Sequence, residues 1–338
     1  MYTMRQFIGS SLWLFFLALL SACGTQSYSP PILFVGETQG TYYRVSYFSE
    51  DTLVSQQQIE NLLADFDTSV SVYNPTSLIT QLNRGSGAFR VDDYFLECLS
   101  IAQEVSQCTE GAFDCTVGPL VEAWGFSFKE KEPMNHQKVD SLKRLVDYRA
   151  IEMDEKMITL GIPGMRLDFN AVAQGVSVEV VARLLLEQGI TRFLVDIGGE
   201  VKASGRKPDG SKWRIAIEKP SDNAVYGQGL EAIVQIHDKA LATSGSYRKF
   251  YVKDGVKYSH TINPLTGYPV THSLLSATVI ADDCGYADAW ATAIMVLGPD
   301  RAKKMVQETP GVEAFLIFSD KNGVSKTWFS EGFRELLE

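Results

Sequence analysis

The sequence is poor in the residues that build zinc sites, disulfide frameworks and redox pairs. Its 338 residues include five cysteines and four histidines, with no CxxC and no combined His and Cys spacing. Cys98 and Cys108 lie ten residues apart in a stretch that is expected to be helical, hence roughly 15 Å apart, which is too far for a disulfide. We therefore expect Cys98, Cys108, Cys115 and Cys284 to be small core residues in a fold stabilised by its hydrophobic core.

Two further absences narrow the function. The sequence has no P-loop and no GxGxxG pattern, which disfavours a Rossmann dinucleotide domain. It also lacks an excess of basic residues: the net charge is −10, and the part after residue 23 has 30 basic and 41 acidic residues, a net charge of −11. A protein that binds nucleic acid through non-specific contacts would be basic, so the composition argues against that class.

The apolar run near the N-terminus is too short to span a membrane. It extends from Ser11 to Leu20, follows a single basic residue, Arg5, and ends in Leu-Ser-Ala-Cys at Cys23. This pattern predicts a lipoprotein signal peptide over residues 1–22, acylation of Cys23 and a polar tether up to residue 31. The alternative is an ordinary secretory signal with an incidental cysteine. Residues 32–338 would then form the globular part.

Periodicity predicts a mixed α/β (α+β) fold. Apolar residues recur at helical spacing at Ile59, Leu62, Leu63 and Phe66, and again at Phe95, Leu99 and Ala102. Strand patterns occupy 42–48, 192–197, 213–217, 231–236, 275–281 and 313–318, and the dipeptides at 254–255 and 322–323 are typical of hairpin turns. Interleaved helices and hairpins favour antiparallel and mixed sheets in two intimately packed lobes.

Polar residues with candidate functional roles are clustered between Thr243 and Thr292. This stretch contains a Thr-Ser-Gly turn at 243–245, then His260 among turn residues, a strand-like segment and the start of a helix. In that helix Asp288, Ala291 and Thr292 would lie on one face. A carboxylate and a hydroxyl one turn apart are hard ligands for Mg²⁺ or Ca²⁺. Alternatively, Asp288 is an ordinary first-turn acid and Thr292 bonds back to its own helix.

Two other segments carry candidate polar residues. In 111–126, Asp114 or Thr116 is expected to cap a helix that Pro119 helps to open. Residues 166–189 predict a short strand ending near Asp168, a turn, and a helix with Val176, Val180 and Leu184 on one side. The pair Gly198-Gly199 after a strand indicates close backbone approach to a ligand or to a neighbouring element.

Eight blocks in order resemble the ApbE family, the FAD:protein FMN transferases, over nearly all of the chain after residue 35. They are QGTYYRV (39–45), SVYNPTSLITQLN (71–83), GAFDCTVGPLVEAWGF (111–126), RLDFNAVAQG (166–175), VDIGGEVKASG (195–205), TSGSY (243–247), YSHTINPLTGYPV (258–270) and ADAWATAIMVLG (287–298).

The resemblance implies that the chain cuts FAD at its diphosphate, esterifies the FMN half to a Thr or Ser hydroxyl of an acceptor protein, and releases AMP with the help of Mg²⁺. It implies FAD contacts from Gln39, Tyr73, Ala112, Phe113, Asp114, Asp168, Gln174 and Ile262. The Mg²⁺ ligands would be Asp288, Thr292 and the carbonyls of Ala171 and Ala291, with His260 as general base. The chain departs from the family at Gln39, where Met is usual, and at Gln174, where Lys or Glu is common.

The sequence leaves three functions open within this resemblance. The first is the FMN transferase, the second is a lipoprotein that stores FAD without turnover, and the third is an FAD diphosphatase that gives FMN and AMP. An acidic protein that handles a diphosphate needs something to neutralise it, and a divalent ion is consistent with this need. A storage protein would not need Asp288 and Thr292, so the presence of both favours the enzyme. Family acceptors are subunits of membrane redox complexes of the Nqr and Rnf type. The chain is thus expected to be lipid-anchored in the bacterial cell envelope, facing the periplasm, on the inner or the outer membrane.

Overall fold

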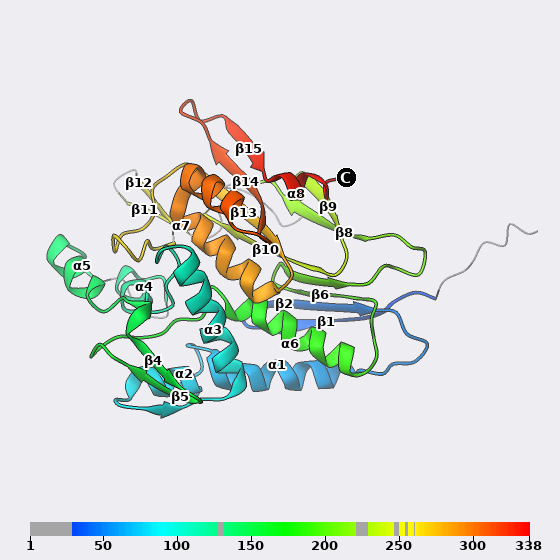
Figure 1. Cartoon of the computed structure of the whole chain (residues 1–338), viewed down its shortest axis with the longest axis horizontal. Helices are drawn as coiled ribbons and strands as arrows, with labels where there is room; N and C mark the ends of the chain where they lie inside the picture. The colour runs from blue at the N-terminus through cyan, green and yellow to red at the C-terminus, as the bar shows by residue number, and fades with distance from the viewer. Residues whose placement is uncertain (1–28, 128–131, 221–228, 247–249, 254–255, 260) are drawn as a thin grey trace, which may run out of the picture. The chain divides into compact units, whose positions relative to one another are not determined.

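An eight-stranded sheet organises the computed structural model, which describes residues 29–127, 132–220, 229–246, 250–253, 256–259 and 261–338 (Figure 1). Neighbouring strands of this sheet pair antiparallel throughout. In spatial order they are β1 (Ile32–Thr38), β2 (Thr41–Tyr47), β6 (Phe193–Ile197), β7 (Glu200–Ser204), β10 (Lys239–Gly245), β13 (Leu274–Ala281), β14 (Glu313–Ser319) and β15 (Ser325–Phe329).

Three smaller sheets and the helices complete the chain. The smaller sheets are β3 (Phe89–Arg90), β5 (Met157–Leu160) and β4 (Ile151–Asp154); β8 (Trp213–Glu218) and β9 (Leu230–Ile236); and β11 (Phe250–Lys253) and β12 (Val256–Ser259). The helices are α1 (Gln56–Val70), α2 (Leu78–Arg84), α3 (Asp93–Cys108), α4 (Gly118–Trp124), α5 (His136–Lys143), the 3₁₀ turn η1 (Tyr148–Ala150), α6 (Ala173–Glu187), α7 (Cys284–Glu308) and α8 (Glu331–Arg334). No helix of the described residues is long and apolar enough to cross a membrane.

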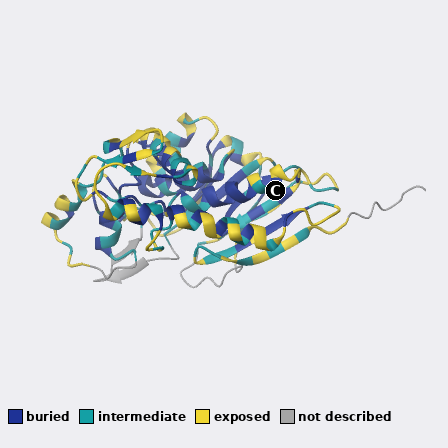
Figure 2. Cartoon of the chain, turned by 90° about the horizontal axis from the view of Figure 1, so that it is seen from below, coloured by how far each residue is buried: buried dark blue, intermediate teal, exposed yellow. Residues whose placement is uncertain are grey.

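Helix α7 is the central element of the core. The Asp283 carboxylate caps its start by accepting from the Tyr286 amide at 2.8 Å, and a kink at Gly298-Pro299 divides the helix. Its first half packs on β10 and β13 of the sheet and against α6 and α3. Nearly every residue there is buried, including Trp290, so the main core surrounds this helix. Buried residues gather between helices and sheet, and exposed ones lie on outer faces (Figure 2).

Most elements predicted from periodicity are confirmed. All six strand patterns are strands, and the two helical patterns form α1 and α3 with Ile59, Leu63 and Phe66 buried in α1. The turn at Asn322-Gly323 joins β14 to β15. Residues 254–255 are outside the described residues, although the flanking strands β11 and β12 pair antiparallel. Among the described cysteines all four are free, and all are buried except the exposed Cys108.

Three local predictions are wrong. Neither Asp114 nor Thr116 caps α4, because the N-cap is Val117 and makes no side-chain bond. Residues 166–168 form only an isolated bridge, Val117 with Arg166, where a short strand was expected. The Thr-Ser-Gly turn is the end of strand β10, whose residues 240–245 pair with β13. In each case a contact from a distant segment determines the local conformation.

Helices α6 and α7 cross closely because glycine stands at both sides of the contact. A Cβ at Gly175 would collide with the Cys284 carbonyl oxygen and lie 2.7 Å from the Cα of Gly285. A Cβ at Gly285 would lie 2.6 Å from Cγ2 of Val176. The buried Glu179 carboxylate of α6 also accepts from the Cys284 amide at 2.8 Å. The start of α7 is therefore fixed to the first turns of α6.

We predict that Gly175→Ala lowers the free energy of unfolding by about 1–3 kcal/mol, because the clash is with backbone and no side-chain rotation relieves it. Urea denaturation of the purified globular part measures this loss. Gly85→Ala is the matched control: Gly85 is exposed at the end of α2, and its added Cβ would meet nothing nearer than the Gln81 carbonyl at 3.2 Å. Its change should stay within about 0.5 kcal/mol. Equal losses in both variants would contradict the close crossing.

Candidate functional site

Asp288 is a buried carboxylate at the crossing of α6 and α7. Its side chain lies in the second turn of α7, not in the first turn where an acid would serve the helix end, and the residue is 6% exposed. Oδ2 accepts from the Gly175 amide at 3.1 Å. Burial raises the pKa of Asp288 to about 7, against which the Gly175 bond lowers it. The first-turn alternative is therefore wrong.

The Ala171 carbonyl lies in the turn that leads into α6. Gly175 is the third residue of that helix, so its amide has no acceptor within the helix itself. Here that amide donates to Asp288, and the backbone bonds of α6 begin with Val176 donating to Val172 at 3.0 Å. Among the described hydrogen bonds none uses the Ala171 carbonyl. The Ala171 carbonyl is thus an acceptor without a described partner, four residues before the Gly175 amide that binds Asp288.

Thr292 follows Asp288 by one turn of α7 and is half-buried. Its Oγ1 lies 3.2 Å from Oγ of Ser244 on β10, so its hydrogen-bond partner belongs to the sheet and not to its own helix. Ala291 is buried within the regular part of α7, where its carbonyl already accepts the helical bond and has one further lone pair.

The donor set fits a hard divalent cation. The described residues contain no group of three or more His, Cys, Asp or Glu that could hold a metal. A cation here would contact one carboxylate, one hydroxyl and carbonyl oxygens, which suit Mg²⁺ or Ca²⁺ and not a soft metal. The Asp288 carboxylate has no basic side chain among its described partners. A cation would supply the missing positive charge.

Asp168 lies seven residues before Gly175, in the segment that leads into α6. Its amide donates to the Cys115 carbonyl at 2.7 Å, and its Oδ1 accepts from the Asn170 amide at 2.8 Å. Burial raises the pKa of this half-buried carboxyl, and the Asn170 bond opposes that shift. Asp168 is thereby placed beside the loop that contains Ala112, Phe113 and Asp114.

A cavity of about 380 Å³ opens beside Asp168. Its walls come from four segments, and the lining residues are Val72, Thr80, Asn83, Arg84, Gly118, Glu122, Ser127, Arg166, Leu167 and Asp168. The volume lies in the range of small-molecule sites. Its lining mixes apolar atoms with both signs of charge.

Asn83 holds one wall of this cavity, and sequence reasoning missed its role. Its Nδ2 donates to the Leu167 carbonyl at 2.8 Å, and its Oδ1 accepts from the Leu167 amide at 2.8 Å. Only an amide side chain both donates and accepts in this way. The bonds join α2 to the residue before Asp168, 84 positions away in sequence, so no local pattern could have indicated them.

Tyr73 lies at the same edge but is not packed into the core. Its residue exposure is 60%, and the Asn170 Nδ2 lies 3.5 Å from its hydroxyl. Burial of the hydroxyl and the nearby Asp168 carboxylate raise the pKa of Tyr73. An aromatic ring exposed beside a cavity is available to stack on a planar ligand. A tyrosine in a loop commonly packs its ring against the protein, but the ring of Tyr73 stays largely exposed.

The Asp114 carboxylate points into the protein and holds its own loop. Oδ1 accepts from the Thr116 amide at 2.8 Å and from the Thr116 hydroxyl at 2.6 Å, and Oδ2 accepts from the Tyr148 amide at 3.1 Å. Burial raises the pKa of Asp114. These bonds make an Asx turn in place of the expected helix cap. Ala112 and Phe113 are buried beside it.

Gln39 and Gln174 meet at a second polar corner. Gln39, at φ 52° in the β1–β2 turn, accepts from the Ser177 hydroxyl at 3.4 Å. Gln174, in the first turn of α6, lies so close to Gly198 that any Cβ there would collide with its amide nitrogen. The predicted close approach at Gly198 is therefore to a neighbouring side chain. Gln174 belongs to the end of α6 that also holds Gly175, and Gln39 contacts that helix through Ser177.

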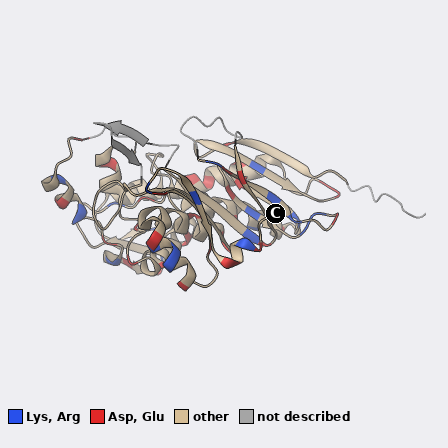
Figure 3. Cartoon of the chain, turned by 90° about the horizontal axis from the view of Figure 1, so that it is seen from above, with Lys and Arg blue, Asp and Glu red and all other residues tan. Residues whose placement is uncertain are grey.

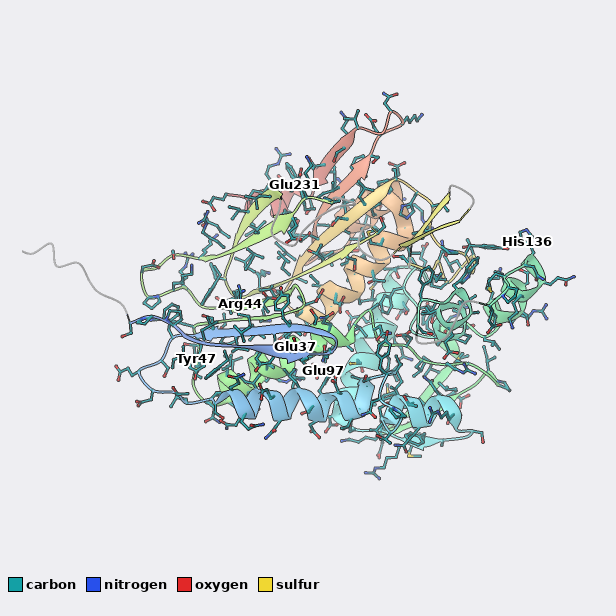
Figure 4. All side chains as sticks on the ribbon, turned by 180° about the vertical axis from the view of Figure 1, so that it is seen from behind. Glu37, Arg44, Tyr47, Glu97, His136 and Glu231 are labelled. Atoms are coloured by element: carbon teal, nitrogen blue, oxygen red, sulfur yellow. The ribbon has the colours of Figure 1, made fainter. Side chains whose placement is uncertain are left out.

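Of the remaining predicted residues, the structure describes Ile262 only. Ile262 is buried against Leu120 and Trp124 of α4. His260 and Cys23 lie outside the described residues. The other three histidines lie away from Asp288: His136 is on α5 at the periphery (Figure 4), His237 pairs with Asp238, and His272 binds the Met295 carbonyl two turns further along α7.

Comparison with known proteins identifies a family that this chain resembles over most of its length. The ApbE family model matches residues 39–316. An FAD:protein FMN transferase of Vibrio cholerae is 34% identical over 334 residues, covering 96% of this chain and 98% of that protein. An FAD:protein FMN transferase of Escherichia coli K12 is 33% identical over 314 residues, covering 89% and 88%.

Solved structures give the same result for the fold. The flavin transferase ApbE from Vibrio cholerae superposes with a TM-score of 0.81 at 32% identity, covering 91% of this chain and 99% of that one. The apo form of the Pseudomonas stutzeri flavinyl transferase ApbE superposes with a TM-score of 0.81 at 31% identity, covering 92% and 98%. The predicted α+β fold with antiparallel sheets is confirmed.

The raised pKa of Asp288 predicts a pH dependence in protein freed of divalent cations with EDTA. The ordinary Asp pKa of 3.8 applies to the unfolded chain and about 7 to the folded one. Between these two values the folded state holds a proton that the unfolded state has lost. The protonated carboxyl therefore contributes its full stabilisation below about pH 4, and this contribution is lost as pH rises through 7. The free energy of unfolding falls by at most about 1.4 kcal/mol per pH unit. Asp288→Asn keeps the acceptor for Gly175 but cannot titrate.

Urea denaturation of both proteins between pH 5 and pH 8 checks this prediction. The free energy of unfolding of the wild type should fall more steeply with rising pH than that of Asp288→Asn. Parallel pH profiles would mean that Asp288 is already ionised near pH 5 and that its burial costs little.

Proposed function

The chain belongs to the ApbE family, and from that membership we propose that it transfers FMN from FAD to a Thr or Ser hydroxyl of an acceptor protein, with AMP as the second product. In this reaction the acceptor oxygen bonds to the phosphorus of the FMN half. The bond from that phosphorus to the bridging oxygen breaks, AMP leaves with the bridging oxygen, and a base takes the hydroxyl proton. The observation that carries the proposal is the buried Asp288 carboxylate at the crossing of α6 and α7, one helical turn before Thr292.

Asp288, Thr292 and the carbonyls of Ala171 and Ala291 would hold Mg²⁺. When bound, the ion would neutralise charge on the diphosphate and on the leaving phosphate. Figure 3 shows basic residues interspersed with acidic ones along the described part of this acidic chain. A bound cation would therefore supply positive charge for the diphosphate. The positive end of α6, whose Gly175 amide reaches Asp288, favours the same anionic group.

The flavin half would bind at Asp168 and the 380 Å³ cavity, with Tyr73 at the rim. Asp168 supplies an acceptor for the ring's polar edge, and Asn83 keeps that carboxylate in place through Leu167. Gln39 would lie near the flavin, and Gln174 would hydrogen-bond FAD through its neutral amide. Asp114 would act through its backbone, because its carboxylate is occupied by Thr116 and Tyr148.

His260 is proposed as the base that takes the acceptor's proton. An imidazole with a pKa near neutrality suits this step. The three described histidines are bound elsewhere, which leaves His260 as the remaining imidazole. Acceptors would be flavoprotein subunits of membrane redox complexes of the Nqr and Rnf type. Storage of FAD without turnover and hydrolysis to FMN and AMP are the competing functions that the assay below separates.

We predict that Asp288→Ala lowers the rate of FMN transfer by about a hundredfold or more, because it removes the carboxylate of the proposed cation site, while FAD binding is largely kept.

Asp168→Ala should mainly weaken FAD binding. Its FAD dissociation constant should rise roughly tenfold or more, since a charged hydrogen bond contributes about 1.5–3 kcal/mol. Acceptor fluorescence in gels, AMP release and calorimetric FAD titration measure these effects across a Mg²⁺ series.

Each competing function gives a different pattern in this assay. Tight FAD binding without AMP release in the wild type would indicate storage. AMP release without labelled acceptor would indicate hydrolysis. Metal-independent transfer by the wild type, or full activity in Asp288→Ala, would refute the cation site while leaving the transferase in place.

For localisation we propose a lipid anchor at Cys23, cleavage after residue 22, and a position on the periplasmic face of the cell envelope. The Leu-Ser-Ala-Cys ending of the apolar run supports this proposal. Cys23→Ser should therefore abolish labelling by a fatty acid and move the protein into the soluble fraction. Continued labelling and membrane partitioning of the variant would count against the anchor, and Cys108→Ser, which removes an exposed cysteine from α3, is the control.

A further inference from the structure

Ser244 occupies the position on β10 that faces Thr292 of α7. Side chains alternate along a strand, and Ala242 packs in the core that surrounds α7 while Leu241 packs in the cluster on the opposite face. Ser244 therefore faces α7 and Thr243 faces away, where its Oγ1 lies 2.9 Å from the Thr278 hydroxyl. The half-buried Ser244 Oγ lies 3.2 Å from Oγ1 of Thr292.

This contact decides the direction of the Thr292 hydroxyl. A threonine in a helix ordinarily satisfies its hydroxyl with the carbonyl four residues earlier, which for Thr292 is that of Asp288. Bonding to Ser244 directs the hydroxyl at the sheet instead, and strand β10 is fixed by pairing with β13 on one side and β7 on the other. The rotamer of Thr292 is thus set by a rigid neighbour.

The chemistry of a hydroxyl ligand requires a partner of this kind. A hydroxyl has one hydrogen and two lone pairs, and an oxygen that presents a lone pair to a cation must send its hydrogen to another acceptor. Contact with a cation also makes the hydroxyl a stronger donor. The described acceptor within reach of Thr292 is Ser244 Oγ.

We propose that Ser244 is a positioning residue: it accepts the hydrogen of the Thr292 hydroxyl and holds the Thr292 oxygen ready for the divalent cation. This inference rests on the proposed function, because it assumes that Thr292 contacts the cation. It assigns to the Thr-Ser-Gly segment of β10 a role in cation affinity. Partners that orient metal ligands typically change metal affinity by roughly 10–100-fold when they are removed.

The test is calorimetric titration of Mg²⁺ into the full-length chain with FAD bound, at pH 8, without acceptor protein. Ser244→Ala should raise the Mg²⁺ dissociation constant roughly 10–100-fold. Ser244→Thr, which keeps the hydroxyl, should restore an affinity near that of the wild type. Thr243→Val removes the neighbouring hydroxyl on the opposite face of β10 and should leave Mg²⁺ affinity unchanged. The FAD dissociation constant measured in EDTA should be the same in all four proteins.

A double variant separates positioning from a general structural effect. If Ser244 acts through Thr292, then Ser244→Ala combined with Thr292→Val should bind Mg²⁺ no more weakly than Thr292→Val alone. Additive losses would overturn the inference, as would unchanged Mg²⁺ affinity in Ser244→Ala.

Asp288→Ala distinguishes failure of the Ser244 inference from failure of the proposed cation site. If it loses Mg²⁺ binding while Ser244→Ala does not, only the Ser244 inference fails; if wild type and Asp288→Ala bind Mg²⁺ alike, the proposed cation site fails with it.

Discussion

The hydrogen bond from the Gly175 amide to the Asp288 carboxylate is the interaction on which the site depends. It forms because glycine at 175 and at 285 lets α6 and α7 approach until backbone meets backbone. It draws the first turn of α6 toward a carboxylate of α7, and it gives an acceptor to a first-turn amide that has none within its own helix. One bond therefore fixes the crossing and orients the carboxylate.

A carboxylate in this position is costly in the absence of a counter-charge. It is buried, and within the described chain its hydrogen bond comes from a neutral amide, so burial raises its pKa to about 7. Near neutrality a proton and the proposed divalent cation would compete for the same oxygens, so that cation binding would release a proton. A folded protein retains such a group when it serves a ligand, which is why perturbed carboxyl groups concentrate at functional sites.

The periodic part of this architecture could be predicted from sequence, and the tertiary part could not. The short apolar run at 275–281 identifies β13, and the i, i+4 spacing identifies the shared face of Asp288 and Thr292, because both are properties of one element. The partners of those residues come from elsewhere: Gly175 from α6, Ser244 from β10, and Asn83 from α2. The failed prediction of a cap at Asp114 has the same cause, since the Tyr148 amide, 34 residues away, completes its hydrogen bonds.

The segment 166–175 joins the two ends of the site into one rigid piece. Asn83 holds Leu167, the Cys115 carbonyl holds the Asp168 amide, Phe169 accepts from Ala173 at 2.7 Å, and Asp288 holds Gly175. Within these ten residues lie the carboxylate proposed for the flavin and the carbonyl proposed for the cation. Because their separation is set by a short, bonded stretch of backbone, neither can move without the other. A reaction at the diphosphate requires such a fixed separation, since catalysis by positioning is lost when the reacting groups shift by about 1 Å.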